Sequence, residues 1–263
     1  MGSATKRSEA KAIDAFARLD SVTSETGSEL LQLSQFLDAN PQVVSALNDA
    51  GIQADDRAAL ADRLFASLGE PSRLALRQAV QGSWSNEREF VDVIERLGLR
   101  ALIQHSGAPV GAEVFAFARL MQSNHELELA LSDKLADPAR KSELLNRLLG
   151  NSVAPATLEI LRHLVSRESK TRLRKRLETV VAFASEVHGN RSATVTTATP
   201  LTEQQRSVIA GSIRASHGVD VDLHEIVDAS VLGGVRILLG SEVIDGSVAA
   251  RLAGLRRELV GAH

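Results

Sequence analysis

The chain has 263 residues, of which 44% are hydrophobic, enough to bury a core and to form more than one domain. With 30 basic residues against 33 acidic ones, the whole chain has no charge footprint for nucleic acid or acidic membranes. The sequence contains no cysteine, which excludes disulfides, thiolate metal sites and thiol catalysis and fits a reducing compartment.

The N-terminal residues 1–12 are polar and lack the apolar run of a secretory signal, so we expect no secretion. No uninterrupted apolar run approaches the ~18 residues that span a bilayer. Attachment to a membrane would therefore need another protein.

Helical periodicity dominates the chain up to about residue 190. Apolar residues recur every three or four positions, as in Leu76, Val80 and Trp84, and give one-sided stripes. Proline and glycine interrupt the stripes, for example at Pro41 and Pro138, which predicts short antiparallel helices with tight connections. This region therefore predicts all-α bundles.

An internal repeat organises the helical region. A shift of 84 positions aligns residues of several types without a gap, including Gly27 with Gly111, Glu29 with Glu113, Asn40 with Asn124 and Asp49 with Asp133. Chance agreement between helices would match leucines but not glycine, asparagine and acidic residues, so the pattern indicates a duplication. The second copy would begin near Gly107, and the helix predicted at 10–19 has no counterpart in it. We expect domains at 1–106, 107–190 and 191–263.

The periodicity changes after residue 190. Residues 191–199 alternate small apolar residues with serine and threonine, which is typical of a strand. Thr202 and Gln205 then form a capping-box pattern that opens a helix. The apolar residues expected to face a core from this helix are Val208, Ile209 and Ile213.

A second strand, a hairpin and a last helix complete the tail. The strand at 219–224 is expected to have one solvated face that carries Asp220, Asp222 and His224. The pair Gly233 and Gly234 precedes a strand at 235–239, and such a pair indicates positive φ or a close backbone crossing. Asp245 is placed to cap a final helix whose apolar face would hold Val248, Leu252, Leu255 and Leu259. The predicted fold is mainly α, with a duplicated antiparallel helical bundle region followed by a small α/β (α+β) C-terminal domain.

Residues that could carry chemistry form no convincing site. Asp220, Asp222 and His224 could be drawn as a metal site or an enzyme's polar face, but polar residues at a period of two are typical of any half-exposed strand. The other histidines lack paired metal-ligand spacing and lie at His105, His125, His163, His188, His217 and His263. The glycine pair lacks the phosphate-loop forms, and no serine lies in a nucleophile elbow. We expect no catalytic residue, no metal site and no cofactor.

A cluster of basic residues lies within 162–176. Its members are Arg162, Arg167, Lys170, Arg172, Arg174, Lys175 and Arg176, with Glu168 as the one acidic residue among them. Such a cluster could bind nucleic acid or anionic lipid. We favour a solvated helix face that meets an acidic partner or a neighbouring helix, because aromatic residues for base stacking are absent.

The pieces near the C-terminus occur in a specific order and spacing: Asp228, Leu232, Gly233, Gly234 and Arg236, followed by Ile244, Asp245, Gly246 and Ser247. This pattern resembles the C-terminal domain of the delta subunit of bacterial F-type ATP synthase, the family of the mitochondrial oligomycin-sensitivity-conferring protein. Residues 10–16 are similar to the family's first helix, so the resemblance covers nearly the whole chain. The repeated helical unit departs from the shorter members and is similar to the long actinobacterial form.

The resemblance implies a non-catalytic stator in the peripheral stalk, attached to the cytoplasmic face of the cell membrane as part of the complex. In that role the helical region would bind the N-terminal helices of the alpha subunits, and residues 191–263 would bind the C-terminal region of the b subunit. The residues considered as partner contacts are Ile13, Phe16, Val248, Leu252, Leu255 and Leu259. The alternative functions are a nucleic-acid adaptor that uses the basic cluster and, last, an enzyme that uses the face with Asp220, Asp222 and His224.

Overall fold

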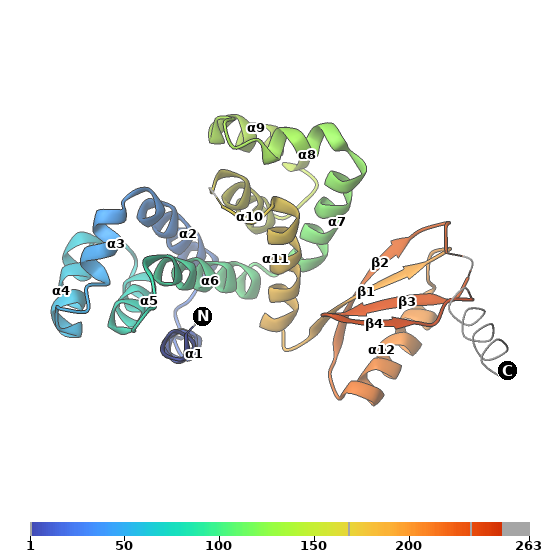
Figure 1. Ribbon diagram of the computed structural model, residues 1–263, viewed down its shortest axis with the longest axis horizontal. Coiled ribbons are helices and arrows are strands. Elements are labelled where there is room, and N and C mark those ends of the chain that lie inside the picture. The colour runs from blue at the N-terminus through green and yellow to red at the C-terminus, as the bar shows by residue number, and fades with distance from the viewer. Residues whose placement is uncertain (1, 168, 232, 249–263) are drawn as a thin grey trace, which may run out of the picture. The chain divides into compact units, whose positions relative to one another are not determined.

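The structure is a computed structural model that describes residues 2–167, 169–231 and 233–248. Within these residues the chain forms eleven helices, then a small sheet of four strands with one further helix (Figure 1). The mainly α fold with a small α/β tail is therefore confirmed. The part of the final helix predicted at 249–263, with Leu252, Leu255 and Leu259, lies outside the described residues.

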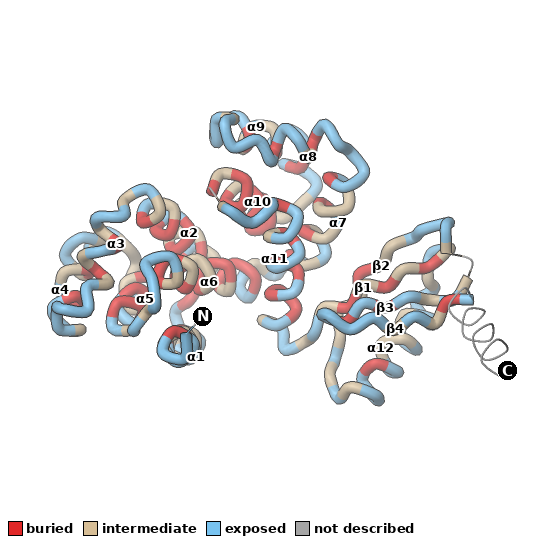
Figure 2. Tube along the Cα trace, in the orientation of Figure 1, coloured by how far each residue is buried: buried red, intermediate tan, exposed pale blue. Residues whose placement is uncertain are grey.

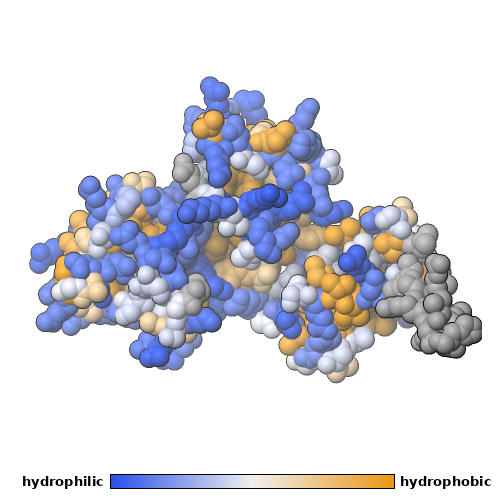
Figure 3. Space-filling view, in the orientation of Figure 1, coloured by the Kyte–Doolittle hydropathy of each residue, from blue (hydrophilic) through white to orange (hydrophobic). Residues whose placement is uncertain are grey.

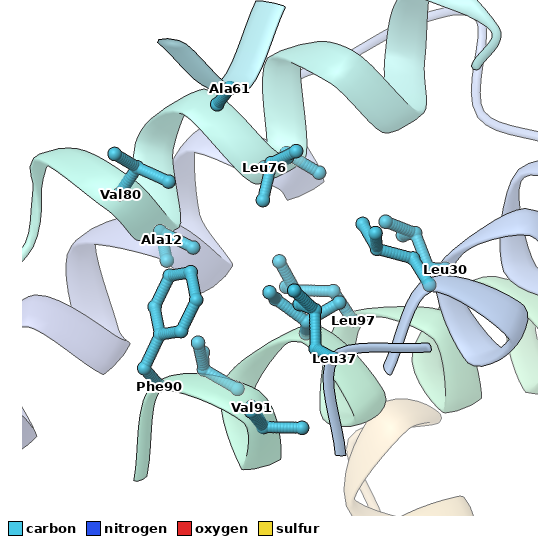
Figure 4. Close-up of a cluster of buried hydrophobic side chains, with 14 of the residues drawn as sticks. Ala12, Leu30, Leu37, Ala61, Leu76, Val80, Phe90, Val91 and Leu97 are labelled. Atoms are coloured by element: carbon cyan, nitrogen blue, oxygen red, sulfur yellow. The ribbon is translucent and has the colours of Figure 1, made fainter. Parts of the chain in front are cut away.

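The first six helices form a bundle around one apolar core. They are α1 (Ser3–Ala17), α2 (Ser24–Ala39), α3 (Pro41–Leu47), α4 (Ala54–Leu64), α5 (Glu70–Gln81) and α6 (Glu87–His105). Leu30 and Leu37 of α2, Leu76 of α5, and Phe90 and Leu97 of α6 are almost completely buried in this core (Figure 4). Burial of apolar area stabilises such a core by about 25 cal/mol per Å².

Capping residues and prolines set the helix starts. The Thr23 side chain accepts from the Thr26 N–H at 3.4 Å before α2, and the Asn86 side chain accepts from the Glu89 N–H at 2.9 Å before α6. Pro41 stands in the first turn of α3, where its missing N–H has no helical partner to lose.

The next five helices repeat the order of α2 to α6. They are α7 (Val110–Ser123), α8 (His125–Ser132), α9 (Pro138–Leu149), α10 (Pro155–Ser166) and α11 (Leu173–Val187). Each begins 84 to 86 residues after its counterpart, so the order of elements repeats as the aligned residues predict.

A glycine allows the same close helix approach in both copies. A Cβ on Gly27 of α2 would lie 2.9 Å from the carbonyl oxygen of Gly98 and 2.7 Å from Cγ of Leu102, both on α6. A Cβ on Gly111 of α7 would lie 3.1 Å from the Cβ of Ala184 on α11. The aligned glycines therefore have a packing reason, which is the close approach of a neighbouring helix: backbone atoms of α6 at Gly27 and a side chain of α11 at Gly111.

Contacts divide the chain into two compact units. One unit contains Met1–Val110 with Asn124–Leu173, and the other contains Gly111–Ser123 with Arg174–His263. The boundaries 106/107 and 190/191 remain predictions from the repeat, since this grouping puts α7 and most of α11 with the C-terminal sheet.

The C-terminal sheet has the order β2-β1-β3-β4. Its strands are β1 (Arg191–Thr197), β2 (Val221–Val227), β3 (Val235–Leu239) and β4 (Glu242–Asp245), and α12 (Glu203–His217) joins β1 to β2. The pair β1 and β2 is parallel, whereas β1 with β3 and β3 with β4 are antiparallel. Helix α12 lies against one face of the sheet (Figure 1), and the core there contains Ala193, Val195, Ile213, Ile237 and Leu239.

Two expectations about this domain are wrong. Val208 is 66% exposed, because only Ile209 and Ile213, four positions apart, lie on the stripe of α12 that faces the sheet. His224 is 6% exposed and does not lie on a solvated face, because the ring of Phe115 from α7 stacks on its imidazole with centroids 4.7 Å apart. Figure 2 shows buried residues along β1.

Candidate partner-binding surfaces

The glycine pair before β3 is a close backbone crossing. Gly233 and Gly234 have φ values of 111° and 81°, and a Cβ on Gly234 would lie 2.5 Å from the carbonyl oxygen of Gly246. The N–H of Val248 donates to the Gly233 carbonyl at 3.1 Å. Only glycine fits at position 234. The role of the glycine pair is therefore structural: it lets the backbone before β3 cross the backbone after β4. Leu232 lies outside the described residues.

Two aspartates fix the turns on either side of this crossing. Oδ1 of Asp228 accepts from the Ser230 N–H at 2.9 Å, and Oδ1 of Asp245 accepts from the Ser247 N–H at 3.0 Å. Hydrogen bonds from the Ser230 side chain and backbone hold the pKa of Asp228 below its ordinary value. Ser247 does the same to the pKa of Asp245, with a smaller contribution from the charge of Arg236. These carboxylates organise turns.

The sheet face opposite α12 carries an exposed apolar pair, Leu238 of β3 and Val243 of β4. The two residues are register partners and are 43% and 48% exposed. Their neighbours Ile237 and Ile244 pack on the α12 side, so alternation places Leu238 and Val243 on the other face. Figure 3 shows hydrophobic residues gathered on the surface around β3, β4 and α12. Exposed apolar residues that lie together are typical of an interaction site.

The first bundle has a cleft of about 380 Å³ between α1 and the end of α5. Its lining is polar and includes Arg7, Ser8, Lys11, Gln78, Gln81 and Ser83. A helix that binds here would be held by hydrogen bonds and charge more than by apolar anchors. The partner-contact candidate Phe16 is only 3% exposed and belongs to the bundle core, and Ile13 packs against the same core. Periodicity in the sequence indicates the apolar face of α1, which explains why Ile13 and Phe16 were chosen as contacts. It does not indicate that the polar face of α1 lines a cleft.

The polar residues considered for metal binding are not brought together as ligands. Asp220 pairs with Arg214 at 3.2 Å, and Asp222 accepts from the Asn190 amide at 2.7 Å. Burial lowers the pKa of His224, against a smaller opposing effect of Asp222. Among the described residues, no group of three histidine, aspartate or glutamate side chains could hold a metal ion.

The basic cluster does not form a single exposed patch. Arg167 is buried and paired with three carboxylates, whereas Arg162 donates from Nε to the Asn146 side chain at 2.7 Å. Lys175 pairs with Glu178 at 3.2 Å. Arg167 is not solvated, but it meets acidic residues of neighbouring helices, which is one of the possibilities in the preferred interpretation. Lys170, Arg172, Arg174 and Lys175 are exposed, and the nucleic-acid alternative stays a prediction.

No helix in the described part of the chain is both long and apolar enough to cross a bilayer.

Comparison with known proteins identifies similar chains. A family model described as ATP synthase delta (OSCP) subunit matches residues 101–259. ATP synthase subunit delta of Leifsonia xyli is 36% identical over 99% of this chain and 100% of its own length. The Streptomyces avermitilis subunit delta is 34% identical over 92% of this chain and 93% of its own. The Corynebacterium kroppenstedtii subunit delta is 36% identical over 89% of this chain and 88% of its own.

Two solved structures, the Polytomella F-ATP synthase and the Toxoplasma gondii mitochondrial ATP synthase hexamer, contain similar chains. The first is 24% identical over 27% of this chain and 90% of that chain, with a TM-score of 0.25. The second is 21% identical over 56% of this chain and 84% of that chain, with a TM-score of 0.32. Neither score is high enough to support an argument about the fold.

Proposed function

The chain belongs to the ATP synthase delta (OSCP) subunit family and has the role of a peripheral-stalk subunit, and we propose that it joins the catalytic head to the stalk. In this proposal the helical region binds the N-terminal helices of the alpha subunits, and the C-terminal region binds the b subunit. The observation that carries the proposal is the match to a subunit delta over 99% of this chain. The chain acts as a non-catalytic link, attached to the membrane through its complex.

The cleft between α1 and α5 supports the alpha contact. Arg7 and Lys11 are exposed and present two positive charges at its edge, while Gln78 and Gln81 offer amides from α5. A helix docked in a groove is a recurring mode of peptide recognition, and charges at a rim guide its approach. We place the alpha contact in the first copy for this reason.

The exposed pair Leu238 and Val243 supports the b contact. Val248, whose N–H donates to the Gly233 carbonyl, is a further exposed apolar residue of this domain at 41%. If the apolar side of a b-subunit helix covered these side chains, burial of their surface would stabilise the complex by about 25 cal/mol per Å² of apolar area. Two modest contacts in one chain reinforce each other because the second binds at a high effective concentration.

Paired substitutions in the full chain test this division. R7E/K11E is expected to weaken binding of an alpha N-terminal peptide about tenfold or more and to leave binding of a soluble b C-terminal segment unchanged. L238D/V243D is expected to weaken binding of the b segment and to leave binding of the alpha peptide unchanged. Binding is measured by calorimetry, and V208D on the exposed side of α12 is the control.

The assignment of separate surfaces to alpha and b would be contradicted if one double variant, with unchanged circular dichroism, lost affinity for both partners equally. The same assignment would be contradicted if R7E/K11E lost binding of the b segment and kept binding of the alpha peptide.

A further inference from the structure

Helix α10 of the second copy docks on α2 and α6 of the first copy through polar side chains. Its contact residues Glu159, His163 and Arg167 are spaced four positions apart, with Arg167 directly after the helix end. This spacing places them along one side. The contact of α10 with α2 and α6 therefore includes polar and ionic bonds, which the apolar core of the first bundle lacks.

Arg167 is the centre of this contact. Its side chain is 3% exposed, and its Nη2 lies 2.9 Å from Oδ1 of Asp92. Its Nε donates to Asp38 at the end of α2, and its Nη1 donates to Glu95 of α6. A planar guanidinium can serve three carboxylates at once, which the point charge of a lysine cannot do with the same geometry.

Three further hydrogen bonds extend the contact along α10. Nε2 of His163 lies 2.7 Å from Oε1 of Glu95, and Nδ1 lies 3.0 Å from the amide nitrogen of Gln35. Since that amide nitrogen only donates, Nδ1 accepts and Nε2 donates to the carboxylate. The Ser28 hydroxyl donates to Glu159 at 2.7 Å.

The first copy uses the same helix side differently. The residues 84 positions earlier are Ala75 and Ala79 within α5 and Ser83 just after it. Ala75 and Ala79 are buried in one core cluster with Ala12 of α1, and the Ser83 N–H donates to the Ser8 hydroxyl of α1 at 2.9 Å. Small residues thus admit α1 in the first copy, and charged residues stand at the same positions in the second.

We propose that Asp38, Asp92, Glu95, His163 and Arg167 form an inter-repeat lock that replaces the missing counterpart of α1. The lock fixes α10 on the first copy in one register, because a buried charge is satisfied only where its partners stand. An apolar contact of the same size would bind without selecting the register. Where the chain acts as a stator, which rests on the proposed function, the lock lets α9 and α10 transmit force with the first bundle.

Amide hydrogen exchange of the purified full-length protein tests the lock without any partner subunit. R167A removes the guanidinium that joins α10 to Asp38, Asp92 and Glu95, while Arg88 still pairs with Asp38 and Asp92 within the first copy. Exchange across residues 155–166 should therefore accelerate about tenfold or more. Exchange in α2 and α6 should change much less, since those helices pack on each other. R162A is the matched control, because Arg162 lies on α10 but bonds Asn146 of α9.

R167K gives a second measurement should R167A fail to fold. It keeps one positive charge but lacks the planar guanidinium that binds several carboxylates at once, so exchange across 155–166 should rise several-fold. The lock would be overturned if exchange across 155–166 were no faster in R167A than in R162A. Where R167A does not fold, the same comparison is made with R167K. Loss of alpha or b binding plays no part in this result, so the lock and the proposed function fail separately.

Discussion

Single residues of the C-terminal turn decide whether its backbone can close. At Gly234, φ is 81° and an added Cβ would lie 2.9 Å from Cα of Ser247, so both conformation and space require glycine. We expect G234A to lower the free energy of unfolding of the sheet domain by about 2 kcal/mol or more. Hydrogen exchange of β1 and β3 with thermal unfolding measures the loss.

Gly211 gives the matched control for this prediction. It lies within α12, and a Cβ there would have no atom within 4 Å. G211A should therefore stabilise the domain by up to about 1 kcal/mol, since alanine is the better helix former. Equal effects of G234A and G211A would contradict the close crossing.

At the scale of elements, one glycine per copy sets how closely two helices approach. G27A should force α2 and α6 apart and destabilise the first bundle by about 1–3 kcal/mol, because the added Cβ would meet backbone atoms of α6 at 2.9 Å. The Cβ of G111A would lie 3.1 Å from the Cβ of Ala184 and 4.0 Å from the Val181 carbonyl oxygen, so its cost should be smaller. Denaturant unfolding of both variants ranks them, and a larger loss in G111A would show that the two crossings are not equivalent.

Local signals in the sequence predicted most elements. Thr202 and Gln205 do form the capping box, with the Gln205 N–H donating to the Thr202 hydroxyl at 3.2 Å, and Gly218 ends α12 with φ of 68°. The repeat predicted the order of helices because both copies keep the same turn residues and apolar phase. Such features depend on neighbours a few residues away, which a single sequence contains.

Contacts between distant segments are what the sequence did not predict. His224 is covered by Phe115, and Arg167 bonds Asp38 from 129 residues away. A polar residue on a strand or helix indicates exposure until a partner from elsewhere is known, and periodicity does not supply that partner. The cleft beside α1 and the apolar pair on the outer sheet face were missed for the same reason.

At the scale of the whole molecule, the proposed stator is a link with one partner contact in its helical region and one at its sheet. The family places the chain in the peripheral stalk, and the described surfaces give each proposed contact a separate location. A link needs both contacts at once, whereas a chaperone or an exchange factor could bind its partners in turn. Simultaneous binding is therefore the property to measure.

The most direct measurement is sedimentation of the full-length chain with an alpha N-terminal peptide and a soluble b segment. We predict one complex that contains all three components, with each partner bound as tightly in the presence of the other as alone. Competition between the two partners, or absence of binding by either, would contradict the stator account.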